Sequence, residues 1–480
     1  MLPIDQVLPE LTATLASQTT VLLQAPPGAG KTTRVPVALM DSPWRQGRRI
    51  LVLEPRRLAA RSAARFMARQ LGEKPGQTVG YRTRLDTRVS TQTAIEVVTE
   101  GILTRMIQSD PLLDDYAAVL FDEFHERSLQ ADLGLARVPE SQQVLRPDLR
   151  VVVMSATLDT APLARMLDDA PVISSEGRAF PVSVIHRPPS TSAGRAPRVT
   201  DHVASVIREV LTTETGSILV FLPGAGEIRQ VERLIRPDLP PDVHLAPLYG
   251  NLKAEEQDRA IQPVPDGERK IVLATAIAET SLTIEGVRVV IDAGQARRAV
   301  FDPNSGMTRL ETGRVSRAAA EQRKGRAGRV EPGVCYRLWS ETDQHGLAAF
   351  TPPEILEADL ALELAQWGAL KPEDLDWLDP PPTAHWNQAV ALLQWLDLLN
   401  PDGTITDHGR NARSLGIHPR LAHMVLKGRE LGYPQSAARL AALLGERDLL
   451  GPGAGVDIGY RLQALSGEYR APNLDRNRLD

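Results

Sequence analysis

Short, nearly uninterrupted apolar runs alternate along the chain with stretches of helical periodicity. The first series predicts buried strands at Val21–Gln24, Ile50–Leu53, Ile95–Thr99, Ala118–Asp122 and Val151–Ser155. Between them, segments such as Leu58–Leu71 carry apolar residues at helical spacing. Strands that are apolar along their whole length and separated by helices are typical of a parallel sheet covered on both faces.

A second series of the same kind follows. It predicts strands at Ser217–Leu222, His244–Leu248, Lys270–Thr275 and Val287–Ile291. Two successive series of alternating strands and helices indicate two α/β lobes. The boundary between them is expected within Gly177–Pro197, which is rich in Pro, Ser, Gly and Arg.

The pattern changes after the second series, because Gly346–Arg420 has no strand series and is broken by three consecutive prolines. It predicts two helical runs and a tight turn leading into a short strand, at Ile355–Leu370, Gln388–Leu399 and Asp402–Thr406. Helices followed by a small hairpin suggest a winged-helix-like module. From Pro419 the chain is expected to be helical, with a loop at Gly451–Gly455.

Length and composition fit a multidomain globular protein. At about 150 residues per domain, 480 residues suggest about three domains. The single Cys335 excludes an intramolecular disulfide framework and a thiolate metal cluster. The first residues lack the basic region of a signal peptide and no apolar run is long enough to span a membrane. We therefore expect a cytoplasmic protein that does not contact membranes.

The net charge of −5 does not exclude nucleic acid, because basic residues cluster locally. Six of them are opposed only by Glu321: Arg314, Arg317, Arg323, Lys324, Arg326 and Arg329. Such a run is either a solvated helix face or a site for phosphate groups.

A phosphate site is predicted after the first strand. Residues 25–33 read Ala-Pro-Pro-Gly-Ala-Gly-Lys-Thr-Thr, between a strand and a helical stretch. In a P-loop, backbone N–H groups and the helix N-terminus face phosphate. Lys31 would reach the β- and γ-phosphates, and Thr32 would ligate Mg²⁺. The other nucleotide-contacting candidates here are Gly28, Ala29, Gly30 and Thr33. A chance Gly-Lys-Thr is the alternative, which the strand–loop–helix context disfavours.

An acidic string follows the fourth apolar run, where Asp122-Glu123-Phe124-His125 ends a strand. Open α/β sheets bind ligands at this carboxyl edge. Asp122 is the candidate Mg²⁺ residue, and Glu123 would position the attacking water. His125 would couple this site to Ser155-Ala156-Thr157. An acid pair at a helix N-terminus is the simpler alternative.

The second lobe carries the string Gln322-Arg323-Lys324-Gly325-Arg326-Ala327-Gly328-Arg329. If it is helical throughout, Gln322 and Arg326 share a face, and Arg326 and Arg329 are neighbours. Guanidinium groups at this spacing act as arginine fingers on a transferring phosphoryl group. The alternative is a patch that binds nucleic-acid backbone. The hydroxyl-rich Thr275–Ile284 follows another strand and would touch phosphate, ribose or nucleic-acid backbone.

In this order, these strings resemble the DExH/DEAH family of superfamily 2 helicases. The resemblance also includes Pro55–Ala60, Thr99–Gly101 and Phe221–Gly224 in the lobes. Beyond the lobes, Asp379–Pro382 and Leu415–Leu421 resemble the winged-helix module of the family and its junction to a helical "ratchet" domain.

The resemblance implies an α/β fold of two tandem RecA-like P-loop lobes with parallel sheets. These would be residues 1–178 and 179–345, followed by a winged-helix-like module at 346–418 and the start of a longer helical domain at 419–480. It also implies a strand-separating β-hairpin at Arg297–Ser316.

The resemblance further implies roles for single residues. Nucleic-acid contacts would come from both lobes: Arg56, Arg57, Arg84, Thr99, Gly101, Gly224, Thr275 and Thr280. Ser281 and Thr283 would lie near the nucleotide. The catalytic set would be Lys31, Glu123, His125, Gln322, Arg326 and Arg329.

We therefore expect an ATP- and Mg²⁺-dependent helicase, a monomer, that moves along single-stranded nucleic acid, with RNA favoured over DNA. Phosphate contacts imply weak sequence preference and salt-sensitive binding. One alternative is a nucleic-acid-stimulated NTPase that remodels RNA–protein complexes without processive unwinding. Two others, a nucleotide-gated binding module and a metabolic P-loop kinase, fit poorly with intact catalytic strings and a second arginine-bearing lobe.

Overall fold

The structure is a computed structural model that describes residues 2–83, 86–156, 160–177, 180–190, 197–279, 284–329, 331–367, 371–446, 448–450 and 455–469. The chain forms two compact units. Unit 1 comprises Met1–Val300, Arg309–Glu357 and Asp376–Asp379. Unit 2 comprises Phe301–Thr308, Ala358–Leu375 and Pro380–Asp480. Both predicted lobes belong to unit 1 except for Phe301–Thr308, which belongs to unit 2, and the predicted four-part division of the chain stays a prediction.

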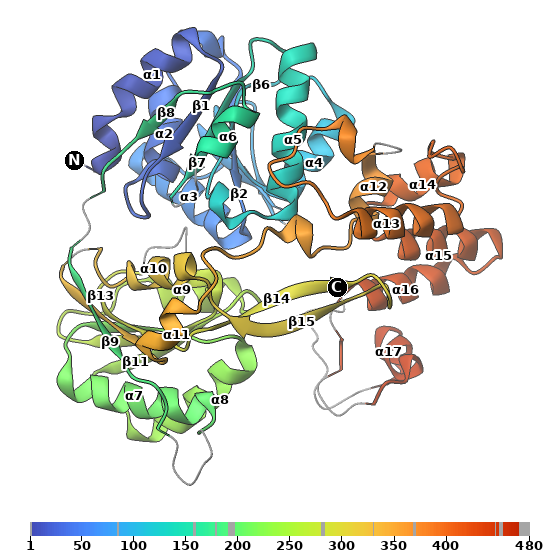
Figure 1. Cartoon of the computed structure of the whole chain (residues 1–480). Coiled ribbons are helices and arrows are strands. Elements are labelled where there is room, and N and C mark those ends of the chain that lie inside the picture. The colour runs from blue at the N-terminus through green and yellow to red at the C-terminus, as the bar shows by residue number, and fades with distance from the viewer. Residues whose placement is uncertain are drawn as a thin grey trace. The chain divides into compact units, whose positions relative to one another are not determined.

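The first lobe is built on an eight-stranded sheet in the order β4-β3-β5-β2-β6-β7-β1-β8 (Figure 1). Its neighbouring strands are parallel except β3 with β4. The five predicted strands are confirmed as β1 (Thr20–Gln24), β2 (Arg49–Glu54), β5 (Ile95–Thr99), β6 (Tyr116–Phe121) and β7 (Arg150–Ser155). The sequence did not predict β3 (Val79–Arg82), β4 (Thr87–Arg88) and β8 (Val172–Ser174), which are short and lie toward the sheet edges.

Helices cover both faces of this sheet, as its continuous apolar strands require. Alternate strand residues such as Val21 and Leu23 pack in the main core cluster, while the intervening Leu22 is also buried. The helices are α1 (Leu8–Ser17), α2 (Lys31–Leu39), α3 (Arg57–Gln70), α4 (Glu100–Ser109), α5 (Leu129–Val144) and α6 (Thr160–Met166). The two buried faces fix the strand register, because a shift by one residue would exchange them.

The second lobe is built on a six-stranded parallel sheet in the order β11-β12-β10-β13-β16-β9. The four predicted strands are confirmed as β10 (Ser217–Phe221), β11 (Val243–Leu248), β12 (Arg269–Ala274) and β13 (Val287–Asp292). The sequence did not predict β9 (Val182–His186) and β16 (Gly333–Arg337). The α-helices described in this lobe are α7 (Val199–Thr213), α8 (Ala225–Ile235), α9 (Ala254–Ile261), α10 (Arg317–Lys324) and the short α11 (Glu341–His345).

A long hairpin leaves the second lobe between β13 and α10. Its strands β14 (Gln295–Asp302) and β15 (Met307–Arg314) form a separate two-stranded sheet (Figure 1). Its base is closed by a hydrogen bond from Val315 N–H to Gly294 O at 3.1 Å. The hairpin expected in this segment is therefore present.

Unit 2 is mainly helical. Its helices are α12 (Ala361–Trp367), η7 (Pro372–Asp374), α13 (Thr383–Trp395), α14 (Asp407–Leu415), α15 (Pro419–Glu430), α16 (Pro434–Gly445) and α17 (Ile458–Leu465). The predicted turn is present: Gly403 has φ +86° and an antiparallel bridge joins Leu399 to Ile405. The short strand expected there is thus reduced to a single bridge.

One helix prediction in this region was wrong. The expected helix Ile355–Leu370 is interrupted, because a 3₁₀ turn η6 (Glu354–Leu356) ends before α12 begins at Ala361. The Asp359 carboxylate accepts a hydrogen bond from Ala361 N–H at 2.9 Å, so this residue caps a new helix instead of continuing one. Residues 368–370 and most of the expected loop at Gly451–Gly455 lie outside the described residues.

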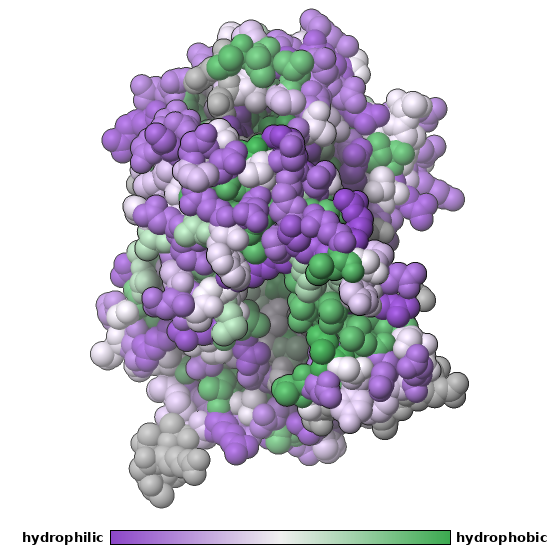
Figure 2. Space-filling model, turned by 90° about the vertical axis from the view of Figure 1, so that its right-hand side faces the viewer, coloured by the Kyte–Doolittle hydropathy of each residue, from purple (hydrophilic) through white to green (hydrophobic). Residues whose placement is uncertain are grey.

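The surface of unit 2 is mixed. The side chains of Trp395 and Leu431 are 74% and 73% exposed, next to charged residues such as Arg429 and Glu430. Figure 2 shows hydrophilic side chains over most of the face that it presents, with apolar side chains gathered in a few groups. Among the described helices, none has the length and apolar content needed to cross a membrane.

Candidate nucleotide and nucleic-acid site

The P-loop candidate has the expected strand–loop–helix form. β1 ends at Gln24 and α2 begins at Lys31, with Gly30 as its N-cap. Gly28 and Gly30 adopt φ values of +84° and +97°, which favour glycine. A Cβ atom at Gly30 would also lie 2.7 Å from Leu2 Cδ1. The backbone thus turns tightly toward the helix N-terminus, where Thr32 and Thr33 occupy the first turn.

The acidic string lies directly beside this loop. Lys31 Nζ is 2.9 Å from Glu123 Oε1 and 4.0 Å from Asp122 Oδ1. Thr32 Oγ1 donates a hydrogen bond to Asp122 Oδ2. Parallel strands bring these groups together, because β1 and β6 both end at the carboxyl edge of the sheet, separated only by β7. Glu123 has φ +50°, an unusual backbone conformation of the kind often found at functional sites.

The charges of this cluster are interdependent. Burial works against the charge of Lys31, but Glu123 and Asp122 outweigh it and hold the Lys31 pKa above its usual value. Burial would likewise raise the pKa of Glu123, yet the nearby Lys31 holds it below its ordinary range. Glu123 is therefore an ionised acceptor, the state needed to orient a water molecule. For Asp122, burial prevails over Lys31 and raises the pKa.

His125 connects the acids to the end of β7. Its Nδ1 accepts a hydrogen bond from Ala156 N–H at 3.3 Å, and its Nε2 lies 3.4 Å from Glu123 Oε2. Burial lowers the pKa of His125, so the ring is neutral near pH 7. The expected coupling to the Ser155–Thr157 string is therefore supported at Ala156, while Thr157 lies outside the described residues.

The second lobe presents its arginines to the same place. A Cβ atom at Gly28 would lie 3.7 Å from Arg329 Nε. Burial lowers the pKa of Arg326 and Arg329, their mutual repulsion lowers that of Arg326 further, and Glu123 acts in the opposite direction on both. Two desolvated guanidinium groups, one of them beside the P-loop residue Gly28 and both within reach of the charge of Glu123, form a cationic arrangement suited to a polyphosphate anion.

The helical register expected for the arginine string was only partly right. α10 ends at Lys324, and Gly325 caps it, so Arg326 and Arg329 do not lie on a helix with Gln322. The chain instead turns at Gly325, and Arg326 Nε donates a hydrogen bond to Glu279 O at 2.8 Å. The glycines in this string explain the early end, because they are poor helix formers.

The basic cluster is not a uniform phosphate-binding face. Arg323 is buried and pairs with Glu279 and Asp292. Arg314 pairs with Asp343, and Lys324 pairs with Glu321. Of the six basic residues, only Arg326 and Arg329 are directed to the nucleotide candidate.

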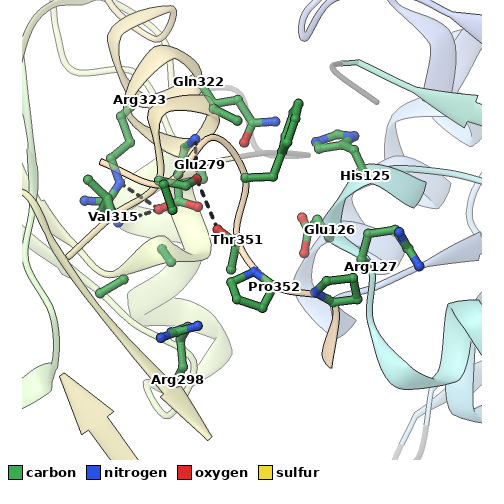
Figure 3. A pocket seen from close by; sticks show the side chains of 18 of the residues that line it. His125, Glu126, Arg127, Glu279, Arg298, Val315, Gln322, Arg323, Thr351 and Pro352 are labelled. Carbon is green, nitrogen blue, oxygen red and sulfur yellow. Dashed lines mark hydrogen bonds and ion pairs between the residues drawn. The ribbon is translucent and has the colours of Figure 1, made fainter. Parts of the chain in front are cut away.

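A cavity of about 600 Å³ lies between the two lobes (Figure 3). His125, Glu126 and Arg127 line it from the first lobe, and Gln322 and Arg323 line it from the second. Arg56 also contributes to the lining, whereas Lys31 does not. The cavity therefore adjoins the acidic cluster at His125 and extends to Arg56, a candidate nucleic-acid residue.

Most of the described nucleic-acid candidates begin a helix. Arg56, Thr99, Gly224 and Thr275 are the N-caps of α3, α4, α8 and η5 (Ala276–Ala278), none with a side-chain cap hydrogen bond. Arg57 and Gly101 are exposed in the first turns of α3 and α4. Within each sheet these helices follow neighbouring strands, so their N-terminal N–H groups lie at one edge.

Several candidate residues have contacts that the sequence did not predict, and others lie outside the described residues. Arg56 donates a hydrogen bond to Ala276 O at 2.5 Å and pairs with Glu126 at 3.0 Å, so it bridges the two lobes in this conformation. Gly224 lies against the guanidinium of Arg297, which pairs with Glu227 at 2.8 Å, so a side chain at position 224 would displace this arginine. Arg84, Thr280, Ser281 and Thr283 lie outside the described residues.

Sequence reasoning missed one acid at the site. Glu54 ends β2, is fully buried, and has its pKa raised well above the ordinary value by burial and by Asp122. It directly precedes the Pro55-Arg56-Arg57 string. The signal was available, because Glu54 ends an apolar run at the same sheet edge as Asp122.

Another buried acid, Glu100, lies between the candidates Thr99 and Gly101. Burial raises its pKa to about 8, against the opposing hydrogen bond from Ser128. Folded protein therefore keeps a proton on Glu100 that the unfolded chain releases above pH 4.5, so this group lowers stability as pH rises from 4.5 toward 8.

We expect Glu100→Gln to raise the melting temperature by about 3 °C or more at pH 8, and by much less at pH 5. Thermal unfolding followed by circular dichroism at both pH values measures this difference. Glu10→Gln, at an exposed position, serves as the control and is expected to leave the melting temperature unchanged at both pH values. An equal shift of the Glu100 variant at both pH values would contradict the assignment.

Comparisons with known proteins agree with this geometry. Residues 5–166 match the DEAD/DEAH box helicase family, and residues 201–331 match the helicase conserved C-terminal domain. The ATP-dependent RNA helicase HrpB of Escherichia coli K12 is 49% identical over 453 residues, which cover 94% of this chain and 55% of that protein. The E. coli ATP-dependent RNA helicase HrpA is 35% identical over 93% of this chain and 35% of its own length.

Solved structures give the same result. The crystal structure of the E. coli DEAH/RHA helicase HrpB has a TM-score of 0.89 and 47% identity, covering 98% of this chain and 59% of that one. A structure described as the E. coli DExH-box NTPase HrpB has a TM-score of 0.84 and 45% identity, covering 100% of this chain and 60% of its own.

The chain spans about half the length of HrpB. It shares with that relative both lobes, over which the two family matches extend. Phe124 within the acidic string is the residue that makes the sequence resemble HrpB in particular, and the comparisons confirm this resemblance. With two RecA-like lobes that bring a P-loop, an acidic string and paired arginines together, the chain belongs to the DExH/DEAH-box family of ATP-dependent helicases.

Proposed function

We propose that this protein is an ATP-driven motor that moves along single-stranded nucleic acid by opening and closing its two lobes. The observation that carries the proposal is the convergence of Lys31 and Glu123 with Arg326 and Arg329 from the other lobe. Because the cluster needs both lobes, hydrolysis and lobe closure are linked.

The residues present fit ATP and Mg²⁺. The positive-φ glycines leave room for phosphate close to the backbone, and Lys31 lies where it can exchange Glu123 for the β- and γ-phosphates. The Thr32 hydroxyl and the Asp122 carboxylate supply oxygen ligands of the kind that Mg²⁺ takes. Bound Mg²⁺ would neutralise charge on the phosphate oxygens. Ser281 and Thr283 are proposed to complete the nucleotide contacts.

Within this site the protein's own groups have separate tasks. Glu123 orients the attacking water, and His125 holds Glu123 in relation to Ala156. Arg326 and Arg329 stabilise charge that develops on the transferred group, with Gln322 beside them. Release of this clamp after hydrolysis lets the lobes separate.

The helix N-termini of both lobes are proposed to bind the nucleic acid. Arg56, Arg57, Thr99 and Gly101 act from the first lobe, and Gly224 and Thr275 from the second, with Arg84 and Thr280 added from the resemblance. Since N–H groups and arginines contact phosphate rather than bases, binding has little sequence preference and weakens with salt. RNA is the proposed strand, because the relatives HrpB and HrpA are named ATP-dependent RNA helicases.

A second function remains a candidate because one HrpB structure is described as that of an NTPase. In that case the chain would use ATP to remodel RNA–protein complexes without processive unwinding. The site itself is compatible with both functions, since both need hydrolysis coupled to lobe movement.

The deciding experiment measures ATP hydrolysis with RNA, with DNA and with neither, together with strand displacement on a tailed duplex. We expect single-stranded RNA to stimulate hydrolysis more than DNA does, and the tailed duplex to be separated only with ATP. Stimulation without displacement would favour remodelling. Hydrolysis that neither nucleic acid changes would contradict the motor proposal.

A further inference from the structure

Arg323 is the largest fully buried side chain in the described chain, with 1% of its surface exposed. Its guanidinium lies 4.9 Å from the centre of the Phe221 ring and contacts two carboxylates. Removing one partner of a buried ion pair is costly, but a well-packed apolar cluster would be at least as stable. Stability alone therefore does not explain an arginine here.

On one side, the Arg323 guanidinium is connected through Glu279 to Arg326, one of the two arginines proposed to contact phosphate. Its Nε donates to Glu279 Oε1 at 2.7 Å, while the Glu279 carbonyl oxygen accepts the hydrogen bond from Arg326 Nε at 2.8 Å. Glu279 thus holds both arginines at once, through its side chain and its backbone. Figure 3 shows Arg323 and Glu279 joined on the second-lobe side of the cavity.

On its other side, the Arg323 guanidinium contacts the base of the β14–β15 hairpin. Its Nη1 donates to Asp292 Oδ1 at 2.7 Å and to Gln295 O, the first residue of β14, at 3.3 Å. Asp292 Oδ1 also accepts from Gly294 N–H at 2.8 Å. Gly294 O in turn receives Val315 N–H, just after β15 ends. Both strands of the hairpin are therefore tied to one guanidinium.

We propose that Arg323 is a positioning residue that couples the segment holding Arg326 to the base of the β14–β15 hairpin. A shift of Glu279 when the nucleotide changes alters the direction of the Arg323 guanidinium, which is fixed by its planar fork of donors. The fork then carries the shift to Asp292 and Gln295, and so to the hairpin. The inference rests on the proposed motor function, together with the strand-separating role that the family resemblance implies for the hairpin.

The alternative is that Arg323 only fills and neutralises the interior of the lobe. The two readings differ in what Glu279 does. For a purely structural role Glu279 is a counter-charge that Asp292 largely duplicates. For coupling, its side chain joins the Arg323 guanidinium to the segment whose carbonyl holds the Arg326 side chain, beside the backbone hydrogen bond from Arg326 N–H to Arg323 O at 3.1 Å.

The test variant is therefore Glu279→Gln, because it leaves the Arg323–Asp292 pair and the Glu279 carbonyl in place. The measured quantity is base pairs displaced per ATP hydrolysed on a tailed RNA duplex. We expect this ratio to fall at least fivefold, with a melting temperature close to that of the unmodified protein. Arg323→Lys, which keeps the charge but loses the fork, is expected to lower the ratio similarly.

Glu321→Gln is the matched control. Glu321 lies on α10, the helix that also carries Arg323. It pairs with Lys324 and Arg337, and not with Glu279 or the hairpin. This variant is expected to leave the ratio unchanged. An unaltered ratio in Glu279→Gln, or the same loss in Glu321→Gln, would overturn the coupling role.

A second readout does not depend on unwinding. A cysteine placed at Ser305, in the turn between β14 and β15, can be labelled with an environment-sensitive fluorophore because the native Cys335 is buried. ADP with beryllium fluoride is expected to change its emission in the unmodified protein and not in Glu279→Gln. If both proteins respond equally, the coupling inference fails. If the unmodified protein does not hydrolyse ATP at all, the proposed function fails instead.

Discussion

Replacing Glu123 by glutamine is expected to slow ATP hydrolysis by about 10²–10⁴-fold while ATP still binds. Glutamine keeps the shape of the side chain but loses the ionised acceptor that the nearby Lys31 maintains. Binding should persist, because Lys31 is released from its 2.9 Å ion pair and remains available to phosphate. Phosphate release in the steady state, together with titration of a fluorescent ATP analogue, measures the two properties separately.

Glu126→Gln is the control for this variant. Glu126 ends the 3₁₀ turn η3 (Phe124–Glu126), of which Glu123 is the N-cap, but its carboxylate pairs with Arg56 at 3.0 Å. Basal hydrolysis in this variant should stay within the same order of magnitude. Turnover by Glu123→Gln at the rate of the unmodified protein would show that another group orients the water.

Replacing Arg326 by glutamine is expected to reduce hydrolysis by about 10³-fold or more, the range seen for arginine fingers. Arg326 is buried beside Arg329 and is held by the carbonyl of Glu279, so its position is fixed before nucleotide arrives. Arg326→Lys should not restore the rate, because an ammonium group lacks the planar pair of donors. Single-turnover hydrolysis with saturating ATP isolates this effect from binding.

Arg317→Gln is the control, since Arg317 comes from the same basic cluster but is exposed at the start of α10. It should leave hydrolysis nearly unchanged. Equal losses in the two variants would indicate that the cluster acts through overall charge, and not through a fixed guanidinium.

The features of the fold that the sequence predicted are those fixed by local pattern. Apolar runs such as Ile95–Thr99 became strands because burial on both faces requires such runs, and the P-loop followed from Gly28, Gly30 and Lys31 next to a strand. Strands at or near the sheet edges, such as β4 and β9, were missed because they are short and partly polar, so the contacts that define them are not local.

For the site, the sequence predicted which motifs would meet at the sheet edge. Strand order explains why Lys31 and Glu123 meet across more than 90 positions, and the rule that ligands bind at carboxyl edges anticipated it. Pairing among side chains was not predictable. The sequence places Arg323 in a basic cluster that is either a solvated helix face or a phosphate site, yet Asp292 and Glu279 hold it in the interior, and only the folded chain brings these three together.

The central claim is that one bound triphosphate is held by Lys31 from the first lobe and by Arg326 and Arg329 from the second. A crystal structure of the protein with ADP, aluminium fluoride and Mg²⁺ tests this most directly. We predict that both guanidinium groups and the Lys31 ammonium lie about 3 Å from phosphate or fluoride ligands. The account is contradicted if the arginines remain out of contact with the bound nucleotide while Lys31 engages it.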